Sequence, residues 1–429
     1  MALSTQPYKG ARDFYPEDKR LQKYMFGIWR TVVERYGYEE YDAPILEPLD
    51  IYLAKSGEEI VNEQTYNFVD RGGRQVVIRP EMTPTVSRMV AARRQQLAYP
   101  LRWYSIPNLW RYERPQRGRL REHWQLNVDV FGLSTVAAEV ELISVVDDIF
   151  KAFGARPDMY RIKLNHRGLI NYLLDDVLSL DETEQHSVSK LIDRMHKLER
   201  SAFISAIDAA ITDAHKASGV TERILAILDS QTIDQLPADA QNHPAVADLR
   251  YVLEELRKTG VTNVEYDVTL MRGFDYYTGI VFEVADTDPE NNRSMMGGGR
   301  YDGLVGLFGV EPVPTVGFGW GDVTLESFLS SHRLLPDLIS TTDLYVALIG
   351  DVESAAQPII KQLRQSLNVA VGAAGRKLGD QFKAAEKLGL TQVLIIGETE
   401  ITSGSLKLKN LATSEELSLT VNEIIATKQ

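Results

Sequence analysis

The stretch QLNVDVFG, residues 125 to 132, constrains the fold more than any other part of the chain. Its polar and apolar residues alternate strictly: Gln125, Asn127 and Asp129 against Leu126, Val128 and Val130. In a strand, such alternation sends the two sets to opposite faces. We therefore expect a sheet with one face packed on a core and the other presenting a row of hydrogen-bonding groups.

The chain has 429 residues, of which 44% are hydrophobic and 25% charged, as in soluble globular proteins. This length favours two or three domains over one. No apolar stretch reaches the roughly 18 residues that cross a bilayer, and the first twenty residues lack the apolar core of a signal peptide. We therefore expect a cytoplasmic protein without a membrane segment.

Cysteine is absent, which excludes disulfides and thiolate metal sites. The seven histidines show neither HxH nor HExxH spacing, so the sequence predicts no metal site built from side chains. The formal net charge of −13 argues against a protein that coats nucleic acid without specificity. A local basic groove remains compatible with this charge, because distant charges are screened beyond about 8 Å at physiological salt.

The pattern changes twice along the first 332 residues. Residues 19–36 and 135–153 have helical periodicity, and QVVIRP, LRWYSIP and QLNVDVFG are predicted strands. From 168 to 258 the period is helical throughout, and strands resume at Val264. We predict an α+β unit made of residues 1–167 and 259–332, interrupted by a helical insertion, residues 168–258.

Residues 340–429 alternate between strands and helices. DLYVALIGD, NVAVG and TQVLIIGE are predicted strands, and residues 353–367 and 377–388 are predicted helices. This alternation favours a small α/β domain with a mostly parallel sheet. Neither GxGxxG nor GxxxxGK[ST] occurs in it, so it contains no recognisable mononucleotide cradle.

Two polar stretches lie in the first part of the chain. IRPEMTP, residues 78–84, places Glu81 after a strand and a proline, where a turn with a solvated glutamate is the alternative. LWRYERPQRGRLREHWQLNVDVFG, residues 109–132, surrounds Glu113 with Arg111, Arg114, Arg117, Arg119 and Arg121. Guanidinium groups suit polyphosphate, and Trp124 beside them suits a stacked base. A solvated arginine-rich hairpin tip would have the same composition.

A third polar stretch is MRGFDYYTGIVFEV, residues 271–284, followed by MGGGRYDGL at 296–304. It sets an arginine, an aspartate and two tyrosines before an apolar run. The glycine triplet allows the backbone to approach a ligand closely, although a bulge or tight turn needs the same residues.

Together these stretches resemble the histidyl-tRNA synthetase family of class II aminoacyl-tRNA synthetases. RYERPQRGRLREHWQLNVDVFG is similar to motif 2, and RGFDYYTG and GGGRYDGL resemble the two histidine-specific signatures. GYEEYDAPILEP, with Pro44, resembles motif 1, and KGARDFYPED resembles the N-terminal opening of the family. The resemblance spans almost the whole chain. It implies a catalytic domain built on an antiparallel sheet, an anticodon-binding domain at 340–429 and a homodimer formed through motif 1.

The resemblance also implies an AMP-forming ligase. L-histidine and ATP, with Mg²⁺, would give histidyl-adenylate and pyrophosphate, and histidine would then pass to the 3′ end of tRNA(His). The implied catalytic residues are Arg111 and Arg272, which would stabilise charge on the α-phosphate from two sides. ATP binding is implied for Arg111, Glu113, Arg119, Arg121 and Trp124. Gln116 and Arg117 would reach the tRNA acceptor end, and Arg376, Lys377 and Lys383 would contact phosphates.

The implied histidine-binding residues are Glu81, Thr83, Arg111, Gln125, Asp129, Arg272, Tyr276 and Tyr277. Glu81, Thr83 and Gln125 would face the ammonium group. Asp129 and Tyr277 would meet the two ring nitrogens, with Tyr276 as a wall of the pocket. A pocket that satisfies polar nitrogens rejects analogues lacking them by about 10⁴-fold or more.

The chain departs from the family pattern at two positions. Asp129 stands where many bacterial members carry glutamate, so the ring must sit closer or a water must intervene. Thr324, in VGFGWGDVTLESF, occupies the apparent position of the motif 3 arginine that clamps ATP; Arg119, Arg121 or Arg300 would have to compensate. This second departure leaves a rival open, a non-charging, synthetase-like regulatory subunit of ATP phosphoribosyltransferase that binds histidine.

Overall fold

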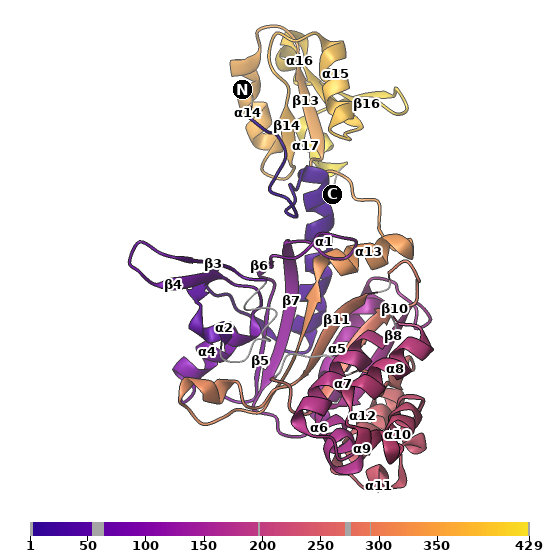
Figure 1. Ribbon diagram of the computed structural model, residues 1–429. Coiled ribbons are helices and arrows are strands. Elements are labelled where there is room, and N and C mark those ends of the chain that lie inside the picture. The colour runs from indigo at the N-terminus through magenta and orange to yellow at the C-terminus, as the bar shows by residue number, and fades with distance from the viewer. Residues whose placement is uncertain (1–2, 54–63, 196–197, 271–275, 292, 428–429) are drawn as a thin grey trace. The chain divides into compact units, whose positions relative to one another are not determined.

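The computed structural model describes residues 3–53, 64–195, 198–270, 276–291 and 293–427 (Figure 1). It divides the chain into two compact units. One contains the residues up to Asp13 together with Gln22–Leu335, and the other contains Phe14–Leu21 and Pro336–Gln429. The domain boundaries predicted within residues 1–332 remain predictions.

A large sheet forms the framework of the first unit (Figure 1). Nine strands of the described chain take part, in the order β1-β5-β7-β12-β11-β10-β8-β9, with β6 paired to β7. They are β1 (Glu39–Glu40), β5 (Leu101–Ser105), β6 (Asn108–Trp110), β7 (Glu122–Phe131), β8 (Tyr160–His166), β9 (Val264–Tyr266), β10 (Ile280–Asp286), β11 (Ser294–Arg300) and β12 (Thr315–Gly321). Each neighbouring pair along β5-β7-β12-β11-β10-β8 is antiparallel. The two edge strands are parallel to their neighbours: β1 pairs with β5, and β9 pairs with β8. The predicted α+β fold with an antiparallel sheet is confirmed.

One face of this sheet is the core face predicted from the alternation in β7. Leu126, Val128 and Val130 are buried there. Helices α1 (Pro16–Arg35), α5 (Ala137–Ala152) and α13 (Asp322–Ser331) supply aromatic partners. Phe150 of α5 stacks on Tyr160 with ring centroids 3.9 Å apart and lies 4.5 Å from Trp320. Packing therefore explains the apolar side chains of β7. The polar side chains on its other face are not part of this core.

A small three-stranded sheet leads into the site. It has the order β2-β4-β3, with β2 (Leu46–Pro48), β3 (Tyr66–Val69) and β4 (Gln75–Ile78). Helices α2 (Asp50–Leu53) and α4 (Thr83–Arg93) and the 3₁₀ turn η4 (Val305–Phe308) lie in the same unit. Because β4 ends just before Glu81 and α4 begins just after it, the two elements fix the position of that carboxylate.

Between the parallel strands β8 and β9 the described chain forms helices, as predicted, and Figure 1 shows them gathered beside β8 and β10. They are α6 (Arg167–Tyr172), the π-helical turn η1 (Leu173–Val177), α7 (Glu182–Arg194), α8 (Arg200–Ala210), α9 (Asp213–Ala217), α10 (Val220–Leu228), the 3₁₀ turn η3 (Ile233–Gln235), α11 (Ala238–Gln241) and α12 (Pro244–Lys258). A parallel pair needs a long crossover, and the insertion supplies it.

The second unit contains a five-stranded sheet in the order β14-β13-β15-β16-β17. Its elements are β13 (Leu344–Leu348), α14 (Glu353–Leu363), β14 (Val369–Val371), α15 (Leu378–Lys387), β15 (Gln392–Ile396), α16 (Glu398–Ser403), β16 (Leu406–Asn410), β17 (Glu416–Leu419) and α17 (Val421–Ala426). The first three strands are parallel, but β16 and β17 form an antiparallel hairpin on β15. The expectation of a mostly parallel sheet is corrected to a mixed one, because the hairpin adds two antiparallel pairs.

Candidate active site

Glycines keep the polar face of the large sheet open. Gly317 of β12 stands opposite Asp129 of β7, and Gly319 follows on the same face. A Cβ on Gly317 would lie 2.0 Å from Asp129 Oδ1, and one on Gly319 would lie 2.7 Å from Gln125 Nε2. The polar side chains of β7 therefore lie across β12, and any larger residue at these positions would displace them.

Asp129 is buried on this face and accepts a hydrogen bond from the Tyr301 hydroxyl. Burial raises the pKa of Asp129 to about 7, and the Tyr301 hydrogen bond opposes that rise. The carboxyl group therefore titrates near neutral pH. It accepts hydrogen bonds when ionised and can donate one when protonated.

Three tyrosine rings connect Asp129 with Glu81. The ring centroid of Tyr276 lies 5.0 Å from that of Tyr277 and 5.5 Å from that of Tyr301. The Tyr276 hydroxyl donates to Glu81 Oε2 at 3.3 Å. Burial and the Glu81 charge raise the pKa of Tyr276 well above its ordinary value, so the phenol keeps its proton. The two predicted carboxylates thus stand at the two ends of one aromatic cluster.

Backbone contacts hold Arg111 next to Glu81. Arg111 Nε donates to the carbonyl of Pro80 at 2.8 Å, and the Trp110 amide donates to the carbonyl of Arg79 at 3.2 Å. The segment that carries Glu81 and the segment that carries Arg111 are therefore joined by a short ladder of hydrogen bonds. This brings together two stretches that the sequence analysis selected separately.

A cavity of about 200 Å³ lies on the same face. The residues lining it include Arg111, Glu113, Arg119, His123, Gln125 and Thr324. Glu113 pairs through Oε2 with Arg119 Nε at 2.5 Å, whereas its buried Oε1 has no hydrogen-bond partner among the described residues. A buried carboxylate oxygen without a partner fits an amino group of a ligand, such as the exocyclic amine of adenine.

His123, rather than Trp124, lines this cavity. Alternation along β7 puts His123 on the side of Gln125 and Trp124 on the side of Leu126. Burial, with the charges of nearby arginines, lowers the pKa of His123 to about 3, so the imidazole is neutral. The strand alternation therefore favours His123 as the ring beside the cavity, and the stacking role of Trp124 stays a prediction.

Two of the three arginines expected to compensate at the motif 3 position are held elsewhere. Arg300 is buried and binds Glu139 of α5 through Nε at 2.7 Å and Nη2 at 2.8 Å. Arg121 lies 4.0 Å over the ring of Tyr112 and donates from Nε to the backbone carbonyl of Glu113. Neither lines the cavity, which leaves Arg119 as the one of the three that does, and the ATP contact of Arg121 stays a prediction.

Thr324 lies at the cavity in the first turn of α13. Its hydroxyl donates to the carbonyls of Met295 at 2.8 Å and Gly321 at 3.0 Å. Thr324 therefore ties α13 to β11 and carries no charge that could clamp a phosphate.

The loop between β6 and β7 places the two residues predicted to meet tRNA at its tip. Gln116 and Arg119 exchange backbone hydrogen bonds across a tight turn. Arg117 is exposed and donates to Glu290 Oε2 at 2.8 Å and to Asn291 Oδ1 at 3.0 Å. A phosphate reaching this tip would compete with those two partners for the guanidinium.

The other predicted residues are placed as follows. Gln125 lines the cavity, and Thr83 begins α4 as a hydrogen-bond partner of Tyr276. Arg272 lies outside the described residues, so its convergence with Arg111 on one phosphate remains a prediction.

The cations predicted in the second unit lie around the start of α15. Arg376, Lys377 and Lys383 are all exposed. Buried Gln381 holds this end of the helix, because its side chain bonds both the amide and the carbonyl of Leu348 in β13. The start of α15, near which the three charges lie, is therefore hydrogen-bonded to β13.

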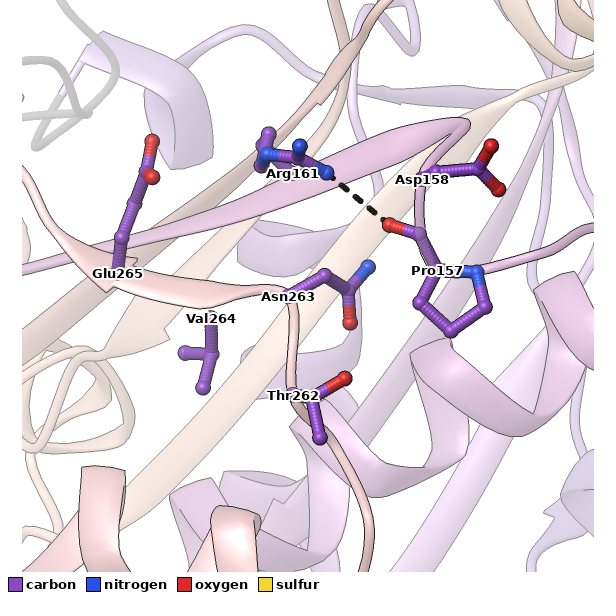
Figure 2. A pocket seen from close by; sticks show the side chains of 7 residues that line it. All are labelled: Pro157, Asp158, Arg161, Thr262, Asn263, Val264 and Glu265. Carbon is purple, nitrogen blue, oxygen red and sulfur yellow. Dashed lines mark hydrogen bonds between the residues drawn. The ribbon is translucent and has the colours of Figure 1, made fainter.

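A larger open pocket, of about 330 Å³, lies at the starts of the paired strands β8 and β9 (Figure 2). Arg161 donates to the carbonyl of Pro157 at 3.0 Å, and buried Asn263 donates to the carbonyl of Tyr160. None of the predicted site residues lines this pocket. The smaller cavity is the candidate active site, because four of the predicted residues line it: Arg111, Glu113, Arg119 and Gln125.

Two properties of the described ranges bear on ligands and membranes. Every helix in those ranges is too short or too polar to cross a bilayer. Those same ranges contain no cluster of three or more histidine, aspartate or glutamate side chains able to hold a metal ion.

Two contributors to the site were missed in the sequence. Tyr301 belongs to GGGRYDGL, but its contact with Asp129 joins residues 172 positions apart. His123 was accessible from the alternation alone, since it precedes Gln125 by two residues.

Comparisons with known proteins cover the whole chain. A family model described as histidyl-tRNA synthetase matches residues 10–321, and one described as anticodon binding domain matches residues 343–428. The histidine–tRNA ligase of Leptospira biflexa serovar Patoc is 43% identical over 427 residues, covering 99% of this chain and 97% of the relative.

The crystal structure of histidyl-tRNA synthetase from Nostoc sp. PCC 7120 superposes with a TM-score of 0.81 at 25% identity, covering all of both chains. A structure from Bacillus halodurans C described as ATP phosphoribosyltransferase regulatory subunit/histidyl-tRNA synthetase shares the fold, with a TM-score of 0.74 at 22% identity, covering 92% of this chain and 99% of that one.

Proposed function

Because the chain belongs to the histidyl-tRNA synthetase family, we propose that the polar face of the large sheet carries the reaction of that family. The function is histidine–tRNA ligation, with histidine, ATP and tRNA(His) as substrates. The observation that supports this location is the continuity of the site. The aromatic cluster between Glu81 and Asp129 and the cavity lined by Arg111 and Glu113 lie on one face.

In the first step, a carboxylate oxygen of histidine attacks the α-phosphorus of ATP. The bond from that phosphorus to the bridging oxygen breaks, and pyrophosphate leaves. Negative charge builds on the phosphate oxygens, so fixed cations stabilise the transition state more than the ground state. We assign this role to Arg111, which its bond to the Pro80 carbonyl holds in place, and to Arg272.

Histidine is proposed to lie along β7. Glu81, Thr83 and Gln125 face its ammonium group, and Asp129 with Tyr277 faces its ring. Since Asp129 and Gln125 are four residues apart on one strand, they are separated by about 13 Å, which leaves room for the amino acid between them. Tyr301 orients the Asp129 carboxyl, which offsets the short reach of an aspartate at this position.

ATP is proposed to occupy the cavity. The unpartnered Oε1 of Glu113 accepts from the adenine amine, Arg119 reaches the phosphate tail, and neutral His123 replaces Trp124 as the ring beside the base. Mg²⁺ is proposed to enter with the phosphates, since it is commonly held by substrate phosphates and only one or two carboxylates.

In the second step, a ribose hydroxyl of the terminal adenosine attacks the carbonyl carbon of the adenylate, and AMP leaves. We assign the acceptor end to Gln116 and Arg117, and tRNA phosphates elsewhere to Arg376, Lys377 and Lys383. A homodimer formed through the motif 1 region, a cytoplasmic location and the domain boundaries at 167, 258, 332 and 340 stand as proposals on the same basis.

Histidine-dependent exchange of labelled pyrophosphate into ATP tests the first step, and charging of tRNA(His) tests the second. Both activities are expected. The alternative is a regulatory subunit that does not charge tRNA, and it remains open because Thr324 replaces the motif 3 arginine. It predicts histidine binding without either activity. Histidine binding by folded protein with no exchange would refute the proposed function.

A further inference from the structure

The two walls of the ATP cavity differ in charge. The wall formed by the β6–β7 loop and β7 carries Arg111, Arg119 and Glu113, and its His123 is neutral. The rest of the lining, from β11, β12 and the start of α13, contributes only uncharged residues in the described chain, Thr324 among them. Among the described lining residues, a triphosphate tail would therefore meet cations only from the β6–β7 loop and β7.

Arg119 does not remove this asymmetry. Its guanidinium pairs with Glu113 at 2.5 Å, so a large part of its charge is already balanced. Arg300 and Arg121 do not line the cavity, as described above. A further cation for the far end of the tail would come from a residue at the edge of the cavity.

Arg293 is placed to supply it. This residue immediately precedes β11, whose first four residues line the cavity. A Cβ on Gly118, at the tip of the β6–β7 loop, would lie 3.6 Å from Arg293 Cδ and 3.7 Å from Thr324 Cγ2. Since Gly118 and Thr324 both line the cavity, the stem of Arg293 reaches its edge, and the guanidinium lies a few bonds beyond that stem.

Arg293 and Thr324 therefore approach the same point from different elements. The short side chain at 324 is used to hold α13 against Met295, two residues beyond Arg293. A long cationic side chain at 293 arrives beside it. The cation that the family carries on the helix, at the position of Thr324, would here stand just before β11, at Arg293.

We propose that Arg293 binds the terminal phosphates of ATP and takes over the clamping role that Thr324 cannot fill. This inference rests on the proposed function, because it assumes that the cavity holds ATP. Guanidinium binds phosphate through charge-assisted, often bidentate hydrogen bonds, which makes its contribution specific to the phosphate tail.

The test compares binding of Mg²⁺·ATP and of AMP by calorimetry, together with the ATP KM in pyrophosphate exchange. Arg293→Ala should weaken ATP binding and raise the ATP KM by roughly ten- to a hundredfold, while AMP binding and the histidine KM stay unchanged. Arg293→Lys should keep part of the ATP affinity. Arg257→Ala, at an exposed arginine of α12, is the matched control and should change neither ligand.

A second variant tests the relocated charge directly. In the Arg293→Ala background, Thr324→Arg returns a guanidinium to the helix and should lower the ATP KM again. Unchanged ATP affinity in Arg293→Ala, or equal losses for ATP and AMP, would overturn the proposal. Parent protein that binds ATP without catalysing exchange would defeat the proposed function and leave the ATP–AMP comparison valid.

Discussion

Asp129 is a buried carboxyl group whose protonation state is expected to affect both stability and the histidine binding proposed for it. Its pKa is about 7 in the folded protein, against an ordinary value of 3.8. Between these two values the folded protein holds a proton that the unfolded chain has released. The free energy of unfolding therefore falls as pH rises through this window, by about 4 kcal/mol at most, and is level again above it.

Asp129→Asn should remove this dependence, because the amide does not titrate and still accepts from Tyr301. The urea midpoint of the variant relative to the parent should rise between pH 5 and pH 8. In pyrophosphate exchange the histidine KM should rise about tenfold or more while the ATP KM is kept. A stability difference that is the same at both pH values would refute the assigned titration.

A glycine is required at position 317 because the side chains of Asp129 and Tyr301 occupy the space of a Cβ, and not because of a positive φ angle. A methyl group there would overlap Asp129 Oδ1 at 2.0 Å and approach the Tyr301 hydroxyl at 2.9 Å. Gly317→Ala should therefore raise the histidine KM by about tenfold or more, with a smaller effect on ATP.

Gly303→Ala, in the same GGGRYDGL signature, is the matched control, since nothing lies within 4 Å of the added Cβ. Equal histidine KM values for the two variants, measured by exchange, would show that the glycine floor does not shape the site.

At the scale of elements, the N-terminal segment fixes the start of α13. Arg12 Nη2 binds Asp322 Oδ2 at 2.6 Å, and Asp322 Oδ1 accepts from the backbone amide of Trp124 in β7 at 3.0 Å. Asp322 is fully buried, and Arg12 opposes the rise in its pKa that burial causes. One carboxylate thus joins the opening segment, β7 and the helix that carries Thr324.

Arg12→Ala should cost about 3 kcal/mol of unfolding free energy, because it leaves a buried charge without its partner. Arg12→Ala/Asp322→Asn should cost less than Arg12→Ala alone, and chemical denaturation of the four proteins of the cycle measures the difference. Glu326→Ala serves as control, since Glu326 is 44% exposed and lies 3.5 Å from Arg12. Additive losses would contradict the coupling.

Across the whole molecule, the net charge of −13 repels a polyanion such as tRNA. Contacts with tRNA must therefore form at local clusters of basic side chains. The exposed cations at α15 belong to a unit separate from the proposed active site. Changes there should affect the nucleic acid step and leave amino acid activation alone.

Lys377→Glu/Lys383→Glu should lower kcat/KM for tRNA charging by about tenfold and reduce its salt dependence, because phosphate contacts release counterions. Pyrophosphate exchange should stay at the parent rate. Lys361→Glu, on α14, offers a control of equal charge change per site. Loss of exchange in the double variant would show that these lysines act on something other than tRNA.

Short-range pattern was enough for much of this protein. The alternation in QLNVDVFG predicted a core face and a polar face, and it places His123 beside Gln125 as well. The helical period of residues 168–258 predicted the insertion, and the family signatures pointed to Glu81, Arg111 and Asp129. These features depend on neighbours within a few residues, which the period of a strand or helix determines.

Tertiary structure decided the rest. It paired Arg300 with Glu139 across 161 positions, stacked Arg121 on Tyr112, set Gly317 opposite Asp129 and brought Arg293 to Gly118. The order of strands in the sheet determines which of two equally charged arginines is buried and which reaches a cavity. That order arises from the packing of distant segments, and no local period encodes it.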